Sequence, residues 1–206
     1  PDGAFQWEVT TEGPVNSAPC VSPSGIIYVG DDLGNLYAIN PDGSLLSGWP
    51  VRVATSRIPS SPAFAGNTIY IGSADKNLYA IDAISGTILW TFTTQAEIET
   101  SPTISGSTIY VTCFCVPGLP PVGLLPPKLY EVDSSGSGNY ILEGRYFLSS
   151  PAVNSGSVYV VGDNLWSLNP NWQFSLPPQT PDTDADCAPA VDVNGVIYVA
   201  AWEGQT

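Results

Sequence analysis

Histidine and methionine are absent from this sequence, and only five of its 206 residues are lysine or arginine. Without histidine, the chain cannot carry a Ser-His-Asp triad or a histidine-anchored zinc centre. The 19 acidic residues leave a formal net charge of −14, so the long-range field repels phosphate backbones and anionic lipid surfaces. We therefore expect no nucleic-acid partner, and hydrolase chemistry lacks its commonest general base.

Long hydrophobic runs are also missing. No stretch approaches the roughly 20 apolar residues that a membrane-spanning helix needs, so we expect no membrane insertion. No charged and then apolar signal segment follows Pro1. Because the chain neither begins with methionine nor contains one, we interpret it as a processed protein or an excerpt of a longer chain.

What the sequence does contain is a repeat with a period of roughly 40 to 50 residues. The near copies GIIYVGDDLGNLYAIN (25–40) and NTIYIGSADKNLYAID (67–82) carry it most clearly. Each repeat starts with Ala or Ser before a proline, at Ala18, Ser61, Ser101, Ser150 and Ala188. A second column aligns the tyrosines Tyr28, Tyr70, Tyr110, Tyr159 and Tyr198. A third column reads LYAIN, LYAID, LYEVD and LWSLN, and a fourth carries the aromatic segments FQWEV, ILWTF and NWQFSL.

Each column is short, rich in β-branched or aromatic residues, and bounded by Gly, Asn, Asp or Pro, which indicates a strand. Asn40 and Asp82 end the third column and precede Gly43 and Gly86, as tight turns require. The repeating unit is therefore a four-stranded antiparallel meander, and such small sheets bury their faces against one another. We predict an all-β fold, a β-propeller of about five blades, as a single domain over residues 1–206.

The pattern S-P-x-V, G-x-I-Y-V-G-S and L-Y-A-I-D resembles the repeat of the pyrroloquinoline-quinone-type, or quinoprotein-like, β-propellers over nearly the whole chain. The segment AIDAISGTILW, from Ala80 to Trp90, is similar to the tryptophan-docking motif of quinoprotein dehydrogenases, with Ser85 where Thr is usual. In that family the motif locks blade to blade, so the resemblance implies fold rather than catalysis. We accordingly expect Trp90 to be largely buried.

The repeats do not make whole blades at both ends of the chain. The sequence opens on a turn and a fourth strand and ends just after a second strand. The N-terminal strand could therefore only partly complete the last blade. The resemblance implies rings of about seven or eight blades, so we favour an excerpt of a larger ring over an imperfectly closed five-blade ring.

Asp182, Asp184 and Asp186 are spaced as a calcium loop begins. Cys187 stands where the Gly of such a loop should be, and Val193 where its bidentate Glu should be. A solvated linker between blades is therefore the favoured interpretation, with a calcium site as the alternative. We expect no other cofactor.

The four cysteines are too few for a disulfide scaffold and lack the C-x-x-C spacing of a zinc site. Cys20 falls in a column of small residues, so we interpret it as a small buried side chain. Cys113 and Cys115 flank Phe114, where the vicinal pair of a quinoprotein site would be suspected, but that pair is adjacent in the family. The disulfide state of these residues and of Cys187 stays open.

A proline-rich insertion at residues 116–127 occupies a hairpin that elsewhere takes only a few residues. Its prolines favour a stiff, extended backbone, and its apolar side chains have no blade face assigned to them. These candidate partner-binding residues are Leu119, Val122, Leu124 and Leu125. The insertion is either a contact surface for another protein or a cover over its own propeller.

We predict a noncatalytic protein-binding or scaffold propeller that is secreted, periplasmic or at the cell surface. The resemblance implies a class with noncatalytic members in outer-membrane assembly. One alternative is a fragment of a pyrroloquinoline-quinone-dependent dehydrogenase, whose tricarboxylate cofactor needs cations and usually calcium. Another alternative is carbohydrate binding through exposed tryptophans, although packing between blades is the favoured role for Trp7, Trp49, Trp90 and Trp172.

Overall fold

A computed structural model describes residues 5–113, 126–143, 149–162, 164–168, 171–175 and 188–199. All of the regular secondary structure in these ranges is β-strand, and the strands form small separate antiparallel sheets. Blade 1 contains β1 (Cys20–Val21), β2 (Ile27–Gly30), β3 (Asn35–Ile39) and β4 (Val51–Arg52). Blade 2 contains β5 (Ala63–Ala65), β6 (Thr68–Gly72), β7 (Asn77–Asp82) and β8 (Ile88–Thr93).

The later repeats follow the same strand order. Blade 3 contains β9 (Thr103–Ser105), β10 (Thr108–Thr112), β11 (Lys128–Asp133) and β12 (Gly138–Glu143). Blade 4 contains β13 (Ala152–Asn154), β14 (Ser157–Val161), β15 (Asn164–Leu168) and β16 (Trp172–Ser175). The fifth repeat contributes the pair β17 (Ala190–Val191) and β18 (Ile197–Tyr198).

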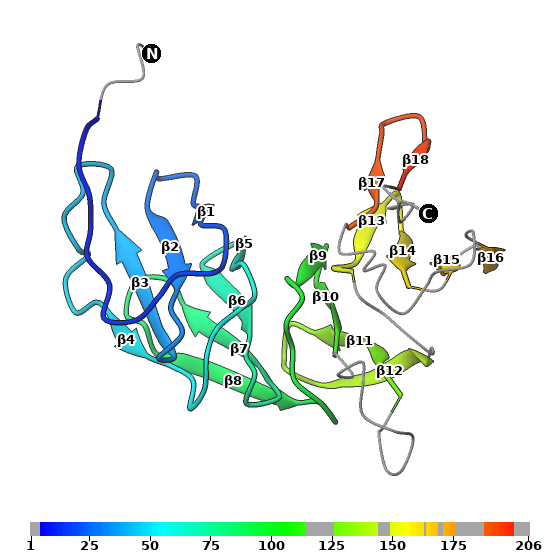
Figure 1. The fold of residues 1–206 in the computed structure, drawn as a ribbon, viewed down its shortest axis with the longest axis horizontal. Helices are drawn as coiled ribbons and strands as arrows, with labels where there is room; N and C mark the ends of the chain where they lie inside the picture. The colour runs from blue at the N-terminus through cyan, green and yellow to red at the C-terminus, as the bar shows by residue number, and fades with distance from the viewer. Residues whose placement is uncertain are drawn as a thin grey trace, which may run out of the picture.

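The sheets follow one another along an arc, with the first strands of successive repeats next to each other in the order β1, β5, β9, β13 and β17 (Figure 1). Each first strand is the innermost of its sheet, and pairing then proceeds outward in chain order. This radial arrangement confirms the predicted all-β propeller of four-stranded antiparallel blades. No helix within the described ranges is long and apolar enough to span a bilayer.

Strand pairing places the repeated sequence columns side by side. The second-strand tyrosine of each blade lies opposite the third residue of the L-Y-A-I-D column, in the pairs Tyr28–Ala38, Tyr70–Ala80, Tyr110–Glu131 and Tyr159–Ser167. Residues paired in this way point to the same face of a sheet. The repeat in the sequence therefore produces the same cross-strand side-chain pair in each of these four blades.

The core lies between blades. Leu36 and Ala38 of blade 1 pack with Ile69 and Ile71 of blade 2, and all four are buried. A second cluster joins blade 2 to blade 3 in the same way, and a third joins blade 3 to blade 4. Because each face is covered only by the neighbouring blade, one repeat alone cannot bury its apolar residues.

Three tryptophans fasten successive units through the same contact. The indole Nε1 of Trp7 donates to the carbonyl of Pro41, that of Trp49 to Ile84 and that of Trp90 to Ser134, each at 3.0 Å. Each acceptor belongs to the turn between the third and fourth strands of the following blade. The docking expected from the sequence is therefore present. Trp49 is 6% exposed, and Trp90, on the outermost strand β8, is partly buried and packs against the core cluster between blades 2 and 3.

The Ser-Pro motif forms a second link nearer the centre. The backbone N–H of Ala18 donates to Ser61 Oγ at 3.0 Å, that of Ser61 to Ser101 Oγ at 2.9 Å, and that of Ser101 to Ser150 Oγ at 2.9 Å. Each seryl hydroxyl thus accepts from the corresponding position one repeat earlier. We call these three bonds the seryl ladder.

The arc does not close within the described residues. Trp7 and Val9 pack against Val29 and Tyr37 of blade 1, where the outer strand of a preceding blade would lie. The strands β17 and β18 pair only with each other there, at the opposite end of the arc (Figure 1). The expectation that the N-terminal strand would partly complete the last blade is therefore not met in this part of the chain.

Candidate functional site

One end of the propeller carries the turns between second and third strands together with the connections from blade to blade. We call it the hairpin end. Two contacts define it: the N–H of Asp32 donates to Pro14 O at 2.8 Å, and the N–H of Ala74 donates to Arg57 O at 3.1 Å. In sequence, the proline-rich insertion lies between β10 and β11, the strands of the third of these hairpins.

Asp31, in the first hairpin, has no exposed surface, and its carboxylate is held by several donors. Oδ1 accepts from the N–H groups of Leu33 and Asn35, both at 2.9 Å. Oδ2 accepts from the N–H of Gly13 at 3.1 Å, from Asn35 Nδ2 at 3.0 Å and from the Tyr37 hydroxyl at 3.1 Å. Burial alone would raise the pKa of Asp31, but these hydrogen bonds outweigh it and hold the pKa below its ordinary value.

Asp75 has the same function in the second hairpin, from a position two residues later in the repeat. Its Oδ2 accepts from the Thr55 N–H at 2.8 Å and from the Tyr79 hydroxyl at 2.8 Å. Burial opposes ionisation of Asp75, but the hydrogen bonds of Thr55, Tyr79 and Asn77 lower its pKa overall. Burial and the nearby carboxylate of Asp75 raise the pKa of Tyr79 to about 12. Asp31 and Asp75 therefore each bind the connection that precedes their own blade, through Gly13 and Thr55, and are not free to bind a partner.

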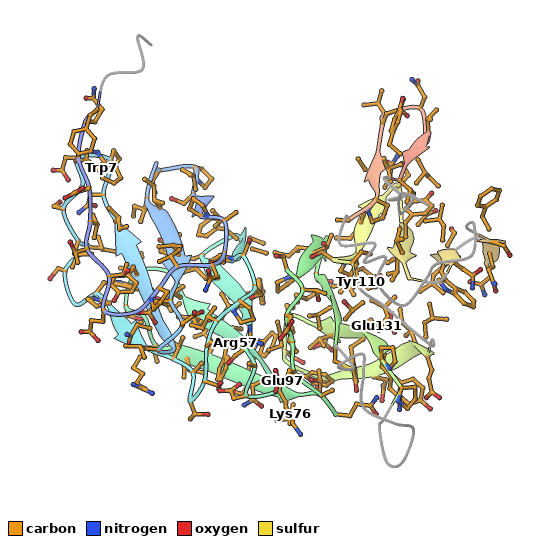
Figure 2. The ribbon with its side chains drawn as sticks, in the orientation of Figure 1. Trp7, Arg57, Lys76, Glu97, Tyr110 and Glu131 are labelled. Atoms are coloured by element: carbon orange, nitrogen blue, oxygen red, sulfur yellow. The ribbon has the colours of Figure 1, made fainter. Side chains whose placement is uncertain are left out.

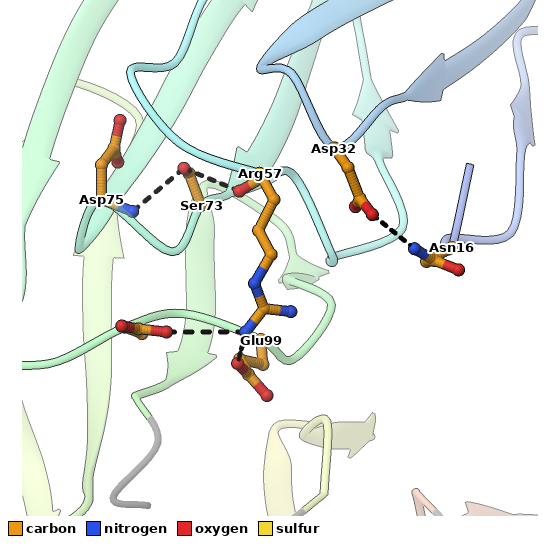
Figure 3. A network of polar contacts seen from close by, with 7 residues as sticks. Asn16, Asp32, Arg57, Ser73, Asp75 and Glu99 are labelled. Atoms are coloured by element: carbon orange, nitrogen blue, oxygen red, sulfur yellow. Dashed lines mark hydrogen bonds and ion pairs between the residues drawn. The ribbon is translucent and has the colours of Figure 1, made fainter. Parts of the chain in front are cut away.

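Figure 3 shows the charged groups that remain at the surface of this end. Asn16 Nδ2 donates to Asp32 Oδ2 at 2.7 Å. Arg57 lies 3.6 Å from Glu97 and donates a hydrogen bond to Glu99, two carboxylates of the next connection (Figure 3). The ion pairs of Arg57 join neighbouring connections, and because they are partly exposed each contributes little, about 0 to 1 kcal/mol.

The two ends of the insertion are firmly held. Cys113 is fully buried and donates its N–H to Lys128 O at 3.0 Å, which closes the base of the hairpin. On the other side, the Gln95 side chain donates to the carbonyl of Pro126. Lys128 continues the base, with its ammonium 3.9 Å from the Tyr140 ring centroid. The insertion therefore leaves the propeller from a rigid base.

The described cysteines are poor redox or nucleophilic groups. Cys20 and Cys113 are both free thiols, and burial raises the pKa of each. A raised pKa disfavours the reactive thiolate. Cys20, interpreted from the sequence as a small buried side chain, is partly buried and packs against the core cluster between blades 1 and 2. Cys115 and Cys187 lie outside the described residues.

The sequence-predicted site residues fall in two segments that the structure does not describe. The calcium candidates Asp182, Asp184 and Asp186 lie outside the described residues, as do the partner candidates Leu119, Val122, Leu124 and Leu125. Within the described ranges, no group of three or more Cys, Asp or Glu side chains could hold a metal ion. The calcium site and the partner-binding residues therefore remain predictions.

The sequence did not lead us to expect that Asp31 and Asp75 hold the connections between blades by hydrogen bonds. The signal that could have found them is the LYA tyrosine, Tyr37 or Tyr79, whose hydroxyl needs a partner on the adjacent hairpin when it is buried. Nor did it lead us to single out Glu131, which stands in a column otherwise filled by Ala38, Ala80 and Ser167.

Radial four-stranded blades, the docked tryptophans and the seryl ladder define a β-propeller built from repeats of the pyrroloquinoline-quinone type. The family described as outer membrane protein assembly factor BamB matches residues 1–111, and the chain belongs to this family. It is 24% identical over 205 residues to the outer membrane protein assembly factor BamB of Salmonella typhimurium, with 89% of this chain and 51% of the relative covered. The chain thus spans about half the length of that relative.

Solved structures show the same fold at low sequence identity. BamB from Moraxella catarrhalis has a TM-score of 0.62 and 16% identity, covering 83% of this chain and 52% of that chain. The computationally designed Ika4 protein has a TM-score of 0.67 and 13% identity, covering 81% of this chain and 98% of that chain. The quinohemoprotein alcohol dehydrogenase ADHIIG from Pseudomonas putida HK5 has a TM-score of 0.70 and 15% identity, covering 95% of this chain and 40% of that chain.

Proposed function

We propose that this chain is a noncatalytic scaffold of the cell envelope that binds another protein, with the insertion at residues 116–127 forming part of the contact surface. Membership of the BamB family supports the scaffold role, since the curated relative is described as an assembly factor of the outer membrane. The observation that carries the contact surface is the rigid base at Cys113, Pro126 and Lys128. A rigid scaffold that presents an apolar loop is a common arrangement for binding.

The described residues do not fit a quinone cofactor. A tricarboxylate needs several cations in one place, whereas Arg57 pairs with two glutamates and Lys128 lies 3.5 Å from Glu143. The other described cations, Arg52 and Lys76, belong to different blades. The donor groups needed for an accompanying calcium ion do not gather anywhere in the described ranges. We therefore propose no enzyme activity and no cofactor.

Carbohydrate binding is also disfavoured. The indole N–H groups of Trp7, Trp49 and Trp90 are already bonded to carbonyls of the next blade. A sugar that stacked on these rings would have to replace contacts that hold the blades together.

Shortening the insertion tests the proposal. Residues 114–125 are replaced by a five-residue turn that copies the sequence of residues 73–77, SADKN, while Pro126, Pro127 and the base at Cys113 are kept. We expect the melting temperature to be preserved, because loop length costs little. Capture of a partner from an envelope extract of the native organism should weaken, mainly through faster dissociation.

A matched variant keeps the length of the insertion and replaces Leu119, Val122, Leu124 and Leu125 by serine. Loss of the partner in both variants, with unchanged unfolding, supports the contact surface. Marked destabilisation of the shortened chain would instead identify the insertion as a cover over the propeller. Retention of every partner by both folded variants would place the binding surface elsewhere.

A further inference from the structure

A row of three paired residues crosses the second, third and fourth strands in blades 2, 3 and 4. In blade 2 the row is Tyr70, Ala80 and Trp90. In blade 4 it is Tyr159, Ser167 and Trp172. In blade 3 the row is Tyr110, Glu131 and Asn139. Blade 3 therefore has an amide in place of the indole and a carboxylate in place of a small residue.

Blades 1 and 2 show which group packs beside the second-strand tyrosine. The Trp90 ring lies beside Tyr70 with centroids 5.8 Å apart, and its N–H donates to Ser134 O. Trp49 has the same relation to Tyr28, also at 5.8 Å, and donates to Ile84 O. In both blades, therefore, the position beside the second-strand tyrosine holds a flat group that donates a hydrogen bond.

In blade 3 the fourth-strand residue of this row is Asn139. A half-open cavity of about 270 Å³ is lined by Thr108, Glu131, Val132, Asp133, Ser137, Gly138 and Asn139. Figure 2 labels Tyr110 and Glu131 on the neighbouring strands β10 and β11. Tyr110 and Glu131 are direct cross-strand partners, and burial, followed by the negative charge of Glu131, raises the pKa of Tyr110. We call this cavity the blade 3 slot.

Glu131 is an exposed carboxylate in the lining of the slot. The three ion pairs among the described residues do not include it. Asp133, on the rim, is already engaged, because its Oδ1 accepts hydrogen bonds from the N–H groups of Ser135 and Ser137. A ligand with N–H donors would therefore meet the carboxylate of Glu131, whose cross-strand partner is Tyr110.

We propose that the blade 3 slot binds the guanidinium group of an arginine side chain from the protein partner. A guanidinium is flat like the indole it replaces, bonds a carboxylate through two parallel N–H groups and stacks on aromatic rings. The acidic field of the chain favours its approach. A lysine ammonium has neither the flat shape nor the paired donors. The identity of the partner rests on the proposed function, but the affinity of the slot for a guanidinium does not.

The test is titration of the isotope-labelled full chain with N-acetyl-arginine methylamide, followed by backbone and side-chain amide shifts in NMR spectra. We expect saturable shifts at Gly138 and Asn139, and binding at least about tenfold weaker for N-acetyl-lysine methylamide. Glu131→Gln should weaken arginine binding by about tenfold or more. Asn139→Trp should abolish it by filling the slot.

Glu8→Gln serves as the matched control, since it removes one exposed carboxylate from the N-terminal segment. Absence of saturable shifts, equal binding of the lysine compound, or equal weakening by Glu8→Gln and Glu131→Gln would overturn the proposal. If Asn139→Trp does not fold, Glu131→Gln carries the test alone. Arginine binding that survives in the shortened-insertion variant separates the slot from the contact surface, because either can then fail without the other.

Discussion

Asp31 is a buried carboxylate that the fold tolerates because five donors surround it, from Gly13, Leu33, Asn35 and Tyr37. An amide at this position would turn its own N–H groups toward N–H donors. Asp31→Asn should therefore lower the free energy of unfolding at pH 7 by about 1 to 3 kcal/mol. Chemical denaturation midpoints measure this loss.

The pH dependence of the same variant gives a sharper result. Because the folded pKa of Asp31 lies below its unfolded value, its contribution to stability is complete above the unfolded pKa of about 3.9 and is lost as the pH falls through the folded pKa. The stability difference between wild type and Asp31→Asn should therefore shrink in acid. A difference that stays constant down to about pH 2.5 would show that the charge of Asp31 contributes nothing, and Glu8→Gln is again the control.

The docking tryptophans differ in burial, and their mutational costs should differ accordingly. Trp49 is 6% exposed and Trp90 is only partly buried. Trp49→Ala should cost about 3 to 5 kcal/mol, and Trp90→Ala should cost less. Trp49→Phe keeps a ring and removes the N–H bond to Ile84 O, so about 1 kcal/mol of loss is expected from that bond. Equal midpoints for wild type and Trp49→Ala would mean that docking does not hold the blades.

At the scale of the strands, a glycine at the end of the second strand in blades 1 and 2 makes room for the connection to the next blade. A Cβ at Gly72 would lie 2.1 Å from Ile98 Cγ2, and one at Gly30 would lie 2.4 Å from Ile58 Cγ2. Gly72→Ala should therefore destabilise the chain by about 1 to 3 kcal/mol through overpacking. Adding Ile98→Val should recover part of that loss, and a double-mutant cycle in denaturant measures the coupling. Simple additivity of the two changes would contradict a direct contact.

The strands and their order could be predicted because the sequence repeats its apolar columns and turn residues in register. The tyrosine column from Tyr28 to Tyr159 and the turn residues at Asp82 and Gly86 indicated the blades and the docking of Trp90. These features depend on local spacing, which a sequence shows directly. The degree of burial of Trp90 depends instead on how far the next blade reaches over β8.

The candidate site was harder to predict, since it depends on contacts between repeats. The hydrogen bond from Thr55 to Asp75 joins blade 2 to the connection that precedes it. The hydroxyl of Ser101 accepts from the N–H of Ser61, which lies 40 residues away in sequence. The blade 3 slot is a difference between repeats, visible as Glu131 in a column of small residues, but its meaning requires the row in which Asn139 replaces a tryptophan.

For the whole molecule, the formal charge of −14 is the dominant electrostatic property. Few basic residues offset it, so the folded chain repels itself at low ionic strength. Salt shortens the range of this repulsion to about 8 to 10 Å near physiological ionic strength. We therefore expect the melting temperature to rise between about 10 mM and 150 mM sodium chloride. A melting temperature that falls over this range would mean that favourable ion pairs such as Arg57–Glu97 outweigh the repulsion.

The seryl ladder has a kinetic consequence. Its bonds connect each repeat only to its immediate neighbour, so the free energy of opening is a sum of local terms and nearest-neighbour terms. Such a chain of units opens from its ends, because an inner unit must break two interfaces and an outer unit only one. Amide hydrogen exchange should accordingly be slowest in the β10 and β11 strands of blade 3 and become faster toward blade 1 and toward β17 and β18.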